Sequence, residues 1–188
     1  MTKAIIFDCY GVLYIDSHLS LAQRYPELSQ EIRDLGRQSD HGWIDKATYL
    51  TGLSQITGES TTSLEDFINS EHHLNGGLIE QVKQLKGAYK IGMLSNVGRG
   101  WLEDFFAKYG IRQLFDVVVL SGEEGVTKPS PEIYAICAER LGVDATDCVM
   151  IDDIADNVAG ADIAGMKGIL FENNEACMKQ LHVILKTN

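Results

Sequence analysis

The sequence is poor in the features that mark fibrous, membrane-spanning or disulfide-rich proteins. Its 188 residues include only 3 prolines, and its 18 glycines follow no period, which excludes collagen-like and proline-rich chains. No uninterrupted apolar stretch approaches the roughly 18 residues that a membrane helix needs. The 4 cysteines have no CxxC or Cys/His metal spacing and lie in or beside apolar runs, which favours reduced thiols. We therefore expect one soluble, cytoplasmic globular unit.

Positive charge is also scarce. The chain has 16 Lys and Arg against 27 Asp and Glu, so its formal net charge is -11 at pH 7. Most of such a surface repels nucleic acid and anionic membranes. We therefore expect neither as a partner, and we expect a small molecule or a protein instead.

Five short apolar runs predict the strands of a sheet. The runs are nearly continuous, which is typical of strands covered on both faces of a parallel sheet. Helical patterns over residues 101–109, 133–141 and 157–164 separate the last four runs, and a helix-starting Ser-Pro-Glu precedes the second pattern. This alternation predicts an α/β fold with a doubly wound parallel sheet. The runs are residues 4–7, 90–94, 117–120, 148–151 and 168–171.

The interval between the first two runs breaks this alternation. It contains no convincing strand, whereas apolar residues recur every three positions from Ile44 to Leu53, and residues 63–68 resemble a helix start. We predict a helical cap over residues 15–80 and an α/β core formed by residues 1–14 and 81–188. An insertion at this point lies above the carboxyl ends of the strands, where ligands bind in open α/β sheets.

Polar side chains follow several of the predicted strands. Asp8, Ser95 and the pair Asp152-Asp153 come at or just beyond strand ends, and Lys128 lies in the loop after the third strand. Carboxylate oxygens suit magnesium, and lysine serves as a point charge for phosphate. A carboxylate beside such a metal can also act as a covalent nucleophile. The pattern favours a divalent cation beside a phosphate-like anion; the alternative is that these groups only cap helices and solvate loops.

Four motifs in order resemble those of the haloacid dehalogenase-like hydrolase superfamily. They are FDCYGVL at residues 7–13, LSN at 94–96, TKPSPEIY at 127–134 and IDDIADN at 151–157. The match spans most of the chain outside the predicted cap. Within the family it looks most like the small sugar-phosphate phosphatases with a helical cap, including the glucose-1-phosphate phosphatase type. The resemblance implies a magnesium-dependent phosphatase acting on a small phosphorylated metabolite.

The resemblance also implies a role for each motif residue. Asp8 would be the nucleophile that becomes an aspartyl-phosphate. Ser95 and Lys128 would hold the transferring phosphoryl group, and Asn96 would belong to the same substrate-binding set. Four groups would bind Mg²⁺: Asp8, the backbone carbonyl of Tyr10, Asp152 and Asp153. Asp152 would do so directly or through water.

Tyr10 departs from the family's usual first motif. That motif normally carries a second aspartate two residues after the nucleophile, acting as general acid and base. A phenol with a reference pKa of about 10 is a poor base at neutral pH, and losing a positioned acid–base costs about 10²–10⁴-fold. We therefore expect slow turnover, a burst of leaving group as phospho-Asp8 accumulates, and faster hydrolysis by a Tyr10→Asp variant.

Tyr10 also leaves two alternatives open. A similar tyrosine occurs in the true haloacid dehalogenases, so the first alternative is a metal-independent 2-haloacid dehalogenase. Those enzymes do not normally keep the paired acids that this chain has as Asp152-Asp153. A retained acidic pair implies a retained cation, which favours the phosphatase. The second alternative is a phosphate-binding or regulatory protein that keeps the pocket and has lost turnover.

Overall fold

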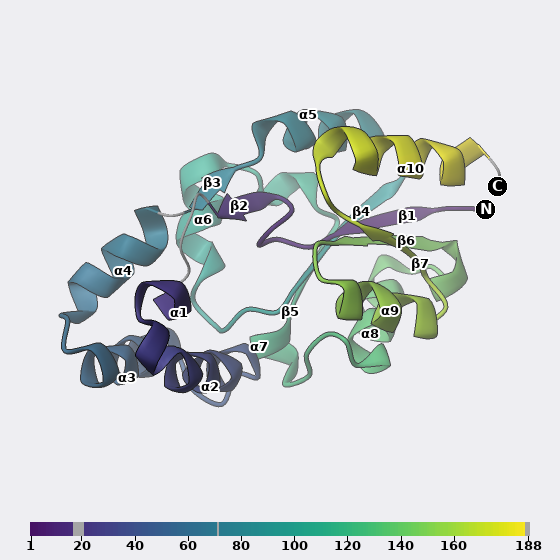
Figure 1. The fold of residues 1–188 in the computed structure, drawn as a ribbon. Coiled ribbons are helices and arrows are strands. Elements are labelled where there is room, and N and C mark those ends of the chain that lie inside the picture. Colours follow the sequence, from purple (N-terminus) through teal and green to yellow (C-terminus); the bar gives the residue numbers. More distant parts are fainter. Residues whose placement is uncertain (17–20, 71, 187–188) are drawn as a thin grey trace.

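A five-stranded parallel sheet forms the centre of the molecule (Figure 1). The structure is a computed structural model and describes residues 1–16, 21–70 and 72–186. All five predicted strands are confirmed to within one residue at either end. In spatial order they are β5 (Val117–Leu120), β4 (Lys90–Ser95), β1 (Ala4–Phe7), β6 (Cys148–Asp152) and β7 (Lys167–Leu170).

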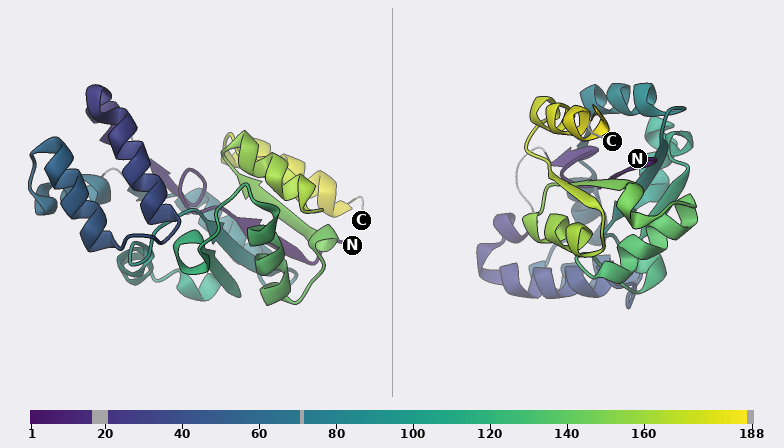
Figure 2. Two further views of the ribbon diagram at one scale, coloured as in Figure 1. Left: turned by 90° about the horizontal axis from the view of Figure 1, so that it is seen from below. Right: turned by 90° about the vertical axis from the view of Figure 1, so that its right-hand side faces the viewer.

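Helices cover both faces of this sheet, which explains why its strands are continuous apolar runs. Along β1, Ile5 and Phe7 belong to one buried cluster, and Ala4 and Ile6 belong to another. The first cluster includes side chains of α5 (Gly76–Leu85), α6 (Leu102–Tyr109) and α10 (Asn174–Lys186). The second includes side chains of α8 (Pro131–Leu141) and α9 (Ala155–Ile163). Figures 1 and 2 show α5 and α10 on one side of the sheet and α8 and α9 on the other.

The helices of the core begin and end largely where the sequence predicts. Pro131 occupies the start of α8, and Gly142 ends it in the left-handed conformation. α9 begins at Ala155, two residues before the predicted start. Four further helical segments are short. One, η1 (Pro26–Leu28), lies between α1 (Leu21–Arg24) and α2 (Ser29–Asp40), and three lie in the core: η2 (Arg112–Leu114), α7 (Ser121–Glu124) and η3 (Ala145–Asp147).

Four helices form a separate group beyond the carboxyl ends of the strands, on the side opposite the two termini (Figure 1). They are α1 (Leu21–Arg24), α2 (Ser29–Asp40), α3 (Lys46–Thr57) and α4 (Thr61–Ser70). The group has its own buried cluster, which includes Ile32, Leu53 and Leu64. We call these four helices the cap. Residues 17–20 and 71 of the predicted insertion lie outside the described residues.

The expectation that the insertion contains no strand is wrong. β2 (Tyr14–Asp16) and β3 (His72–Leu74) form an antiparallel pair where the chain leaves the core and returns to it. Three residues each are too few to produce a recognisable alternation. The predicted boundary at residues 80 and 81 also falls inside α5, whose side chains pack in the core. No helix among the described residues is long and apolar enough to cross a membrane.

Candidate active site

The sheet topology places several motif residues at one point. β1 lies between β4 and β6, and the chain continues from it first to one side of the sheet and later to the other. Such a switch point opens a crevice at the carboxyl ends of the strands. Asp8 follows β1, Ser95 ends β4 and Asp152 ends β6, and all three side chains are buried. The convergence that the sequence predicts is therefore present.

Lys128 joins two of these carboxylates. Its Nζ atom lies 3.0 Å from Oδ1 of Asp8 and 2.6 Å from Oδ2 of Asp152, and it donates a hydrogen bond of 3.1 Å to the carbonyl of Leu94. The lysine side chain is fully buried. Burial alone would lower the pKa of Lys128, but the adjacent charges of Asp8 and Asp152 outweigh it and raise that pKa. Lys128 is therefore a permanent positive charge in the crevice.

Asp8 is held in place by its surroundings but is costly to ionise. Its Oδ1 atom accepts a hydrogen bond of 2.6 Å from the backbone N–H of Cys9. Burial raises the pKa of Asp8 to about 6; Lys128 and a hydrogen bond with Ser95 act in the opposite direction, and the charge of Asp152 adds to the rise. A further cation near Asp8 would favour the carboxylate form that a nucleophile requires.

Asp153 completes an acidic cluster with Asp8 and Asp152. Each of the three offers a carboxylate oxygen, and these oxygens lie within 4.8 Å of one another. Gly11, at φ +81°, brings the loop after β1 close to this point, because a Cβ atom there would lie only 2.3 Å from Oδ2 of Asp153. Lys128 pairs with Asp8 and Asp152, and Asp153 brings a third carboxylate to the same point. Three clustered carboxylate oxygens are hard donors that fit a divalent cation such as Mg²⁺.

Hydrogen bonds orient the carboxylate of Asp152. They come from residues for which the sequence predicts no role. The Oδ1 atom of Asp152 accepts hydrogen bonds from the backbone N–H of Ile154 at 2.9 Å and from Nδ2 of Asn157 at 3.0 Å. The hydroxyl of Tyr134 in turn donates to the carbonyl of Asn157 at 2.6 Å. Asn157 and Tyr134 both lie inside the four motifs. Their place in the motifs is the only feature of the sequence that could have pointed to them. These contacts leave the Oδ2 atom of Asp152 for Lys128.

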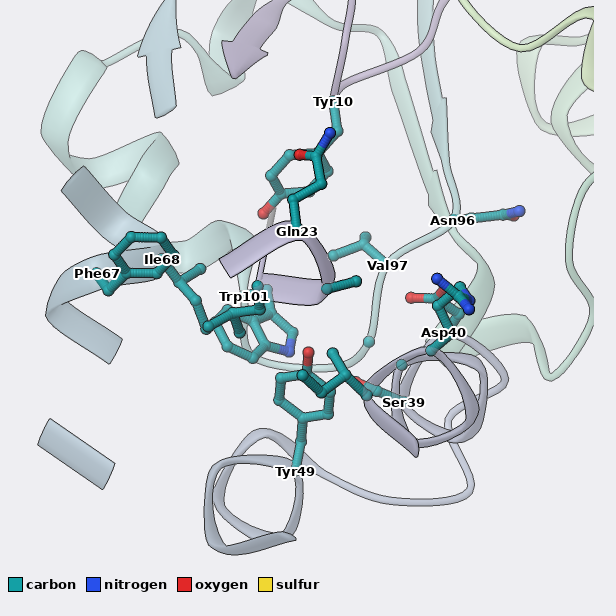
Figure 3. A pocket seen from close by; sticks show the side chains of 16 residues that line it. Tyr10, Gln23, Ser39, Asp40, Tyr49, Phe67, Ile68, Asn96, Val97 and Trp101 are labelled. Atoms are coloured by element: carbon teal, nitrogen blue, oxygen red, sulfur yellow. The ribbon is translucent and has the colours of Figure 1, made fainter. Parts of the chain in front are cut away.

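Asn96 contacts the backbone of Lys128 through both ends of its amide. Its Nδ2 atom donates to the carbonyl of Lys128 at 2.9 Å, and its Oδ1 atom accepts from the N–H of Lys128 at 2.8 Å. Figure 3 shows the amide pointing away from the other labelled side chains. These two hydrogen bonds hold the Lys128 backbone. That Asn96 also binds substrate stays a prediction.

A cavity of about 610 Å³ adjoins these residues, between the cap and the core (Figure 3). Tyr10 and Asn96, close in sequence to Asp8 and Ser95, line its core side. Tyr49 of α3 and Trp101 also line it, with ring centroids 5.5 Å apart in an edge-to-face arrangement. Asp40, at the end of α2, also lines the cavity, and the sequence does not predict it as a site residue. No motif marks this position, because it lies in the cap.

Comparison with known proteins identifies the family. Residues 2–165 match the haloacid dehalogenase-like hydrolases, and the chain belongs to this family. Over 92 residues it is 30% identical to fructose-1-phosphate phosphatase YqaB of Escherichia coli, covering 49% of each protein. Curated relatives include phosphatases named for different substrates, and glucose-1-phosphate is not singled out. The matches span about half the length of these relatives or less.

Solved structures confirm the fold. An enzyme of this family from Bacteroides thetaiotaomicron, bt-2542, superposes with a TM-score of 0.83 at 20% identity, covering 96% of this chain and 98% of that one. The L-2-haloacid dehalogenase of Xanthobacter autotrophicus superposes with a TM-score of 0.68 at 22% identity, covering 97% of this chain and 83% of that one. The α/β core of this chain is thus shared with both of these solved structures.

Proposed function

We propose that the protein is a magnesium-dependent phosphatase that hydrolyses a small phosphorylated metabolite through an aspartyl-phosphate on Asp8. The observation that carries the proposal is the buried contact of Lys128 with both Asp8 and Asp152, next to the exposed carboxylate of Asp153. This arrangement combines a nucleophile, a fixed positive charge and a cluster of three carboxylates. A site for a phosphate monoester with a divalent cation needs all three.

Each residue near Asp8 has a task in this reaction. Asp8 attacks phosphorus, while Lys128 and the hydroxyl of Ser95 bind the oxygens of the phosphoryl group. Asn96 holds the backbone of Lys128, so that the ammonium group stays in position. The residues that would hold Mg²⁺ are Asp8, Asp152, Asp153 and the backbone carbonyl of Tyr10. When bound, the ion would neutralise phosphoryl charge and favour ionised Asp8. In support, the structural neighbour bt-2542 is known in complex with magnesium and inorganic phosphate.

The cavity supports a small organic leaving group. Its volume of about 610 Å³ lies within the usual range for small-molecule sites. The relative YqaB is a fructose-1-phosphate phosphatase, which makes sugar phosphates the first substrates to examine. The aromatic walls formed by Tyr49, Phe67 and Trp101 would pack against the carbon skeleton.

The proposal is tested by an Asp8→Asn variant. An amide has a similar volume but cannot form the acyl phosphate, so phosphate release from a panel of phosphorylated metabolites should be abolished. Wild type is also mixed with a substrate that it hydrolyses and examined by intact-protein mass spectrometry. This should detect a phosphoryl adduct on wild type that the variant lacks. Asp66→Asn, on the exposed side of α4, is the matched control and should keep full activity. Unchanged turnover in Asp8→Asn would refute the mechanism.

A second candidate is a metal-independent 2-haloacid dehalogenase. Tyr10 in the first motif and the structural likeness to an L-2-haloacid dehalogenase favour it. The discriminating assay offers haloacids and phosphate esters side by side, with magnesium or with a chelator. Halide release that is insensitive to the chelator would establish the dehalogenase. Phosphate release that stops on chelation would establish the phosphatase.

A further inference from the structure

Among the described residues that line the cavity, Asp40 is the only one with a carboxyl group. This matters because Tyr10 occupies the position where the family usually has its proton-transferring aspartate. The other phenol in the cavity is no substitute: burial, and then the charge of Asp40, raise the pKa of Tyr49 to about 12. If a side chain moves protons at the leaving group at neutral pH, the cavity offers Asp40 for the task.

Asp40 belongs to the cap but is tied to the core. The hydroxyl of Ser121, at the start of α7, donates a hydrogen bond of 2.6 Å to the carbonyl of Asp40 and accepts one of 2.9 Å from the backbone N–H of Val97. The carbonyl of Val97 in turn accepts a hydrogen bond of 3.0 Å from the backbone N–H of Gly122. Ser95, the predicted phosphate ligand, lies two residues before Val97. The end of α2 is thus joined through one buried hydroxyl to the loop that follows Ser95.

Close backbone packing fixes the same end of α2. Gly42 has φ +70°, and a Cβ atom there would lie 2.1 Å from the carbonyl oxygen of Gly122. A Cβ atom on Gly98 would lie 2.2 Å from the hydroxyl of Ser39. Larger residues at either position would push the cap away from the core. The approach of cap and core at Asp40 is therefore specified by the sequence, and the carboxyl group is held on a rigid support.

The carboxyl group of Asp40 interacts with residues of both the core and the cap. It interacts electrostatically with Lys128 on the core side and with Tyr49 on the cap side. Burial raises the pKa of Asp40 to about 7, against the opposing effect of Lys128. A group with this pKa can both give and accept a proton near neutral pH. The ionisable groups near it are Lys128, Tyr10, Tyr49, Arg33, Arg99 and His41, and α7, which packs against α2, adds Glu123 and Glu124.

We propose that Asp40 is the general acid and base of the reaction, in place of the carboxylate missing at position 10. The inference depends on the phosphatase function proposed above. In the first step, a bond forms between Asp8 and phosphorus, the bond from phosphorus to the leaving oxygen breaks, and Asp40 gives its proton to that oxygen. In the second step, water attacks phosphorus, its proton passes to Asp40, and the bond to Asp8 breaks. Asp40 is then protonated again.

This assignment changes what Tyr10 implies for the rate. The sequence leads us to expect slow turnover, since no carboxylate follows Asp8 at the usual distance. With Asp40 in the cavity, wild type has a proton donor for strongly basic leaving groups and a base for water. Slow turnover and accumulation of phospho-Asp8 become properties of a variant without Asp40.

The test compares Asp40→Asn with wild type on two kinds of substrate. An alkyl phosphate such as fructose 1-phosphate needs a proton on its leaving oxygen, so kcat/KM should fall by about 10²–10⁴-fold. With 4-nitrophenyl phosphate the phenolate leaves unaided, so the variant should give a rapid burst of nitrophenol and slow steady-state turnover. The fall of wild-type alkyl phosphate hydrolysis above about pH 7 should be absent in the variant.

Controls separate a chemical role of Asp40 from a structural one. Asp34→Asn, on the exposed side of the same helix, should behave as wild type, and Asp40→Glu should recover part of the alkyl phosphatase activity. Equal losses on both substrates without a burst, or no loss at all, would overturn the assignment of Asp40 while leaving the phosphatase intact. If wild type hydrolyses neither these two phosphates nor any other phosphate ester of the panel, the proposed function is refuted instead.

A double variant gives the sharpest outcome. Adding Tyr10→Asp to Asp40→Asn restores a carboxyl group at the family's usual position, so alkyl phosphate hydrolysis should recover and the burst should shrink. In an otherwise wild-type background, Tyr10→Asp should bring little gain. A large gain in that single variant would mean that Asp40 does not perform the proton transfers.

Discussion

The ammonium group of Lys128 lies 2.6 Å from a carboxylate oxygen of Asp152, and both side chains are fully buried. Burying charges is costly, and their mutual attraction repays the cost only when every remaining polar atom is also paired. Here the pairing is extensive: Asp152 accepts from Ile154 and Asn157, and Lys128 also contacts Asp8 and Leu94. The pair fixes the position of the positive charge at the end of the central strands. Its stability depends on each of the partners.

Removing the lysine charge should therefore destabilise the folded protein. Lys128→Met keeps most of the side-chain volume but leaves Asp8 and Asp152 without their cation, which we expect to cost about 3–5 kcal/mol of unfolding free energy. Lys83→Met is the control, because its ion pair with Glu80 is exposed and should contribute about 0–1 kcal/mol. Urea unfolding of both variants measures the difference. Equal costs would mean that the buried cluster adds nothing to stability.

Magnesium should stabilise the native protein through the acidic cluster. Because the cluster is assembled only in the folded chain, millimolar Mg²⁺ should raise the melting temperature relative to a chelator. Asp153→Asn removes an exposed member of the cluster and should reduce the shift, whereas Asp156→Asn, an exposed acid at the start of α9, should not. An absent shift in wild type, combined with halide release from haloacids, would favour the dehalogenase.

The core and its motif residues could be predicted because their signals are local. Strands buried on both faces give continuous apolar runs, and the parallel sheet brings their carboxyl ends together wherever the intervening chain goes. Asp8, Ser95 and Asp152 are therefore placed by the strands that precede them. The short pair β2 and β3 gave no such signal, because three residues cannot establish a period.

Asp40 could not be predicted for a different reason. It precedes no strand and belongs to no motif, and its surroundings come from segments far apart in sequence. Its carbonyl meets Ser121, 81 residues away, and its carboxyl group responds to Lys128. These contacts depend on how the cap packs on the core, which no local pattern encodes. Asn96 shows the same limit, since its motif position was visible but its use by the Lys128 backbone was not.

The hydroxyl of Ser121 should control the position of the cap. Ser121→Ala removes the bridge between the carbonyl of Asp40 and the N–H of Val97, leaving buried polar groups without this partner, at a cost of about 1–3 kcal/mol. Alkyl phosphate hydrolysis should fall more than 4-nitrophenyl phosphate hydrolysis, because Asp40 loses its fixed position. Ser63→Ala, whose exposed hydroxyl contacts Glu59 within the cap, is the control. A change in stability without this substrate dependence would limit Ser121 to a structural role.

The carboxyl group of Asp40 should destabilise the native state above neutral pH. Its pKa is about 7 in the folded protein against an ordinary value of 3.8, so between these values the native state holds a proton that the unfolded chain has released. Stability must then fall as pH rises through this range, and the loss is complete above about pH 7. Asp40→Asn removes the ionisation, so it should match wild type near pH 4 and exceed it at pH 8 by up to about 4 kcal/mol. Urea unfolding at the two pH values, with Asp34→Asn as the exposed control, measures this difference. A variant less stable than wild type at pH 8 would show that the ionised carboxylate is stabilised in the native structure, and that Asp40 is not the strained acid required for proton transfer.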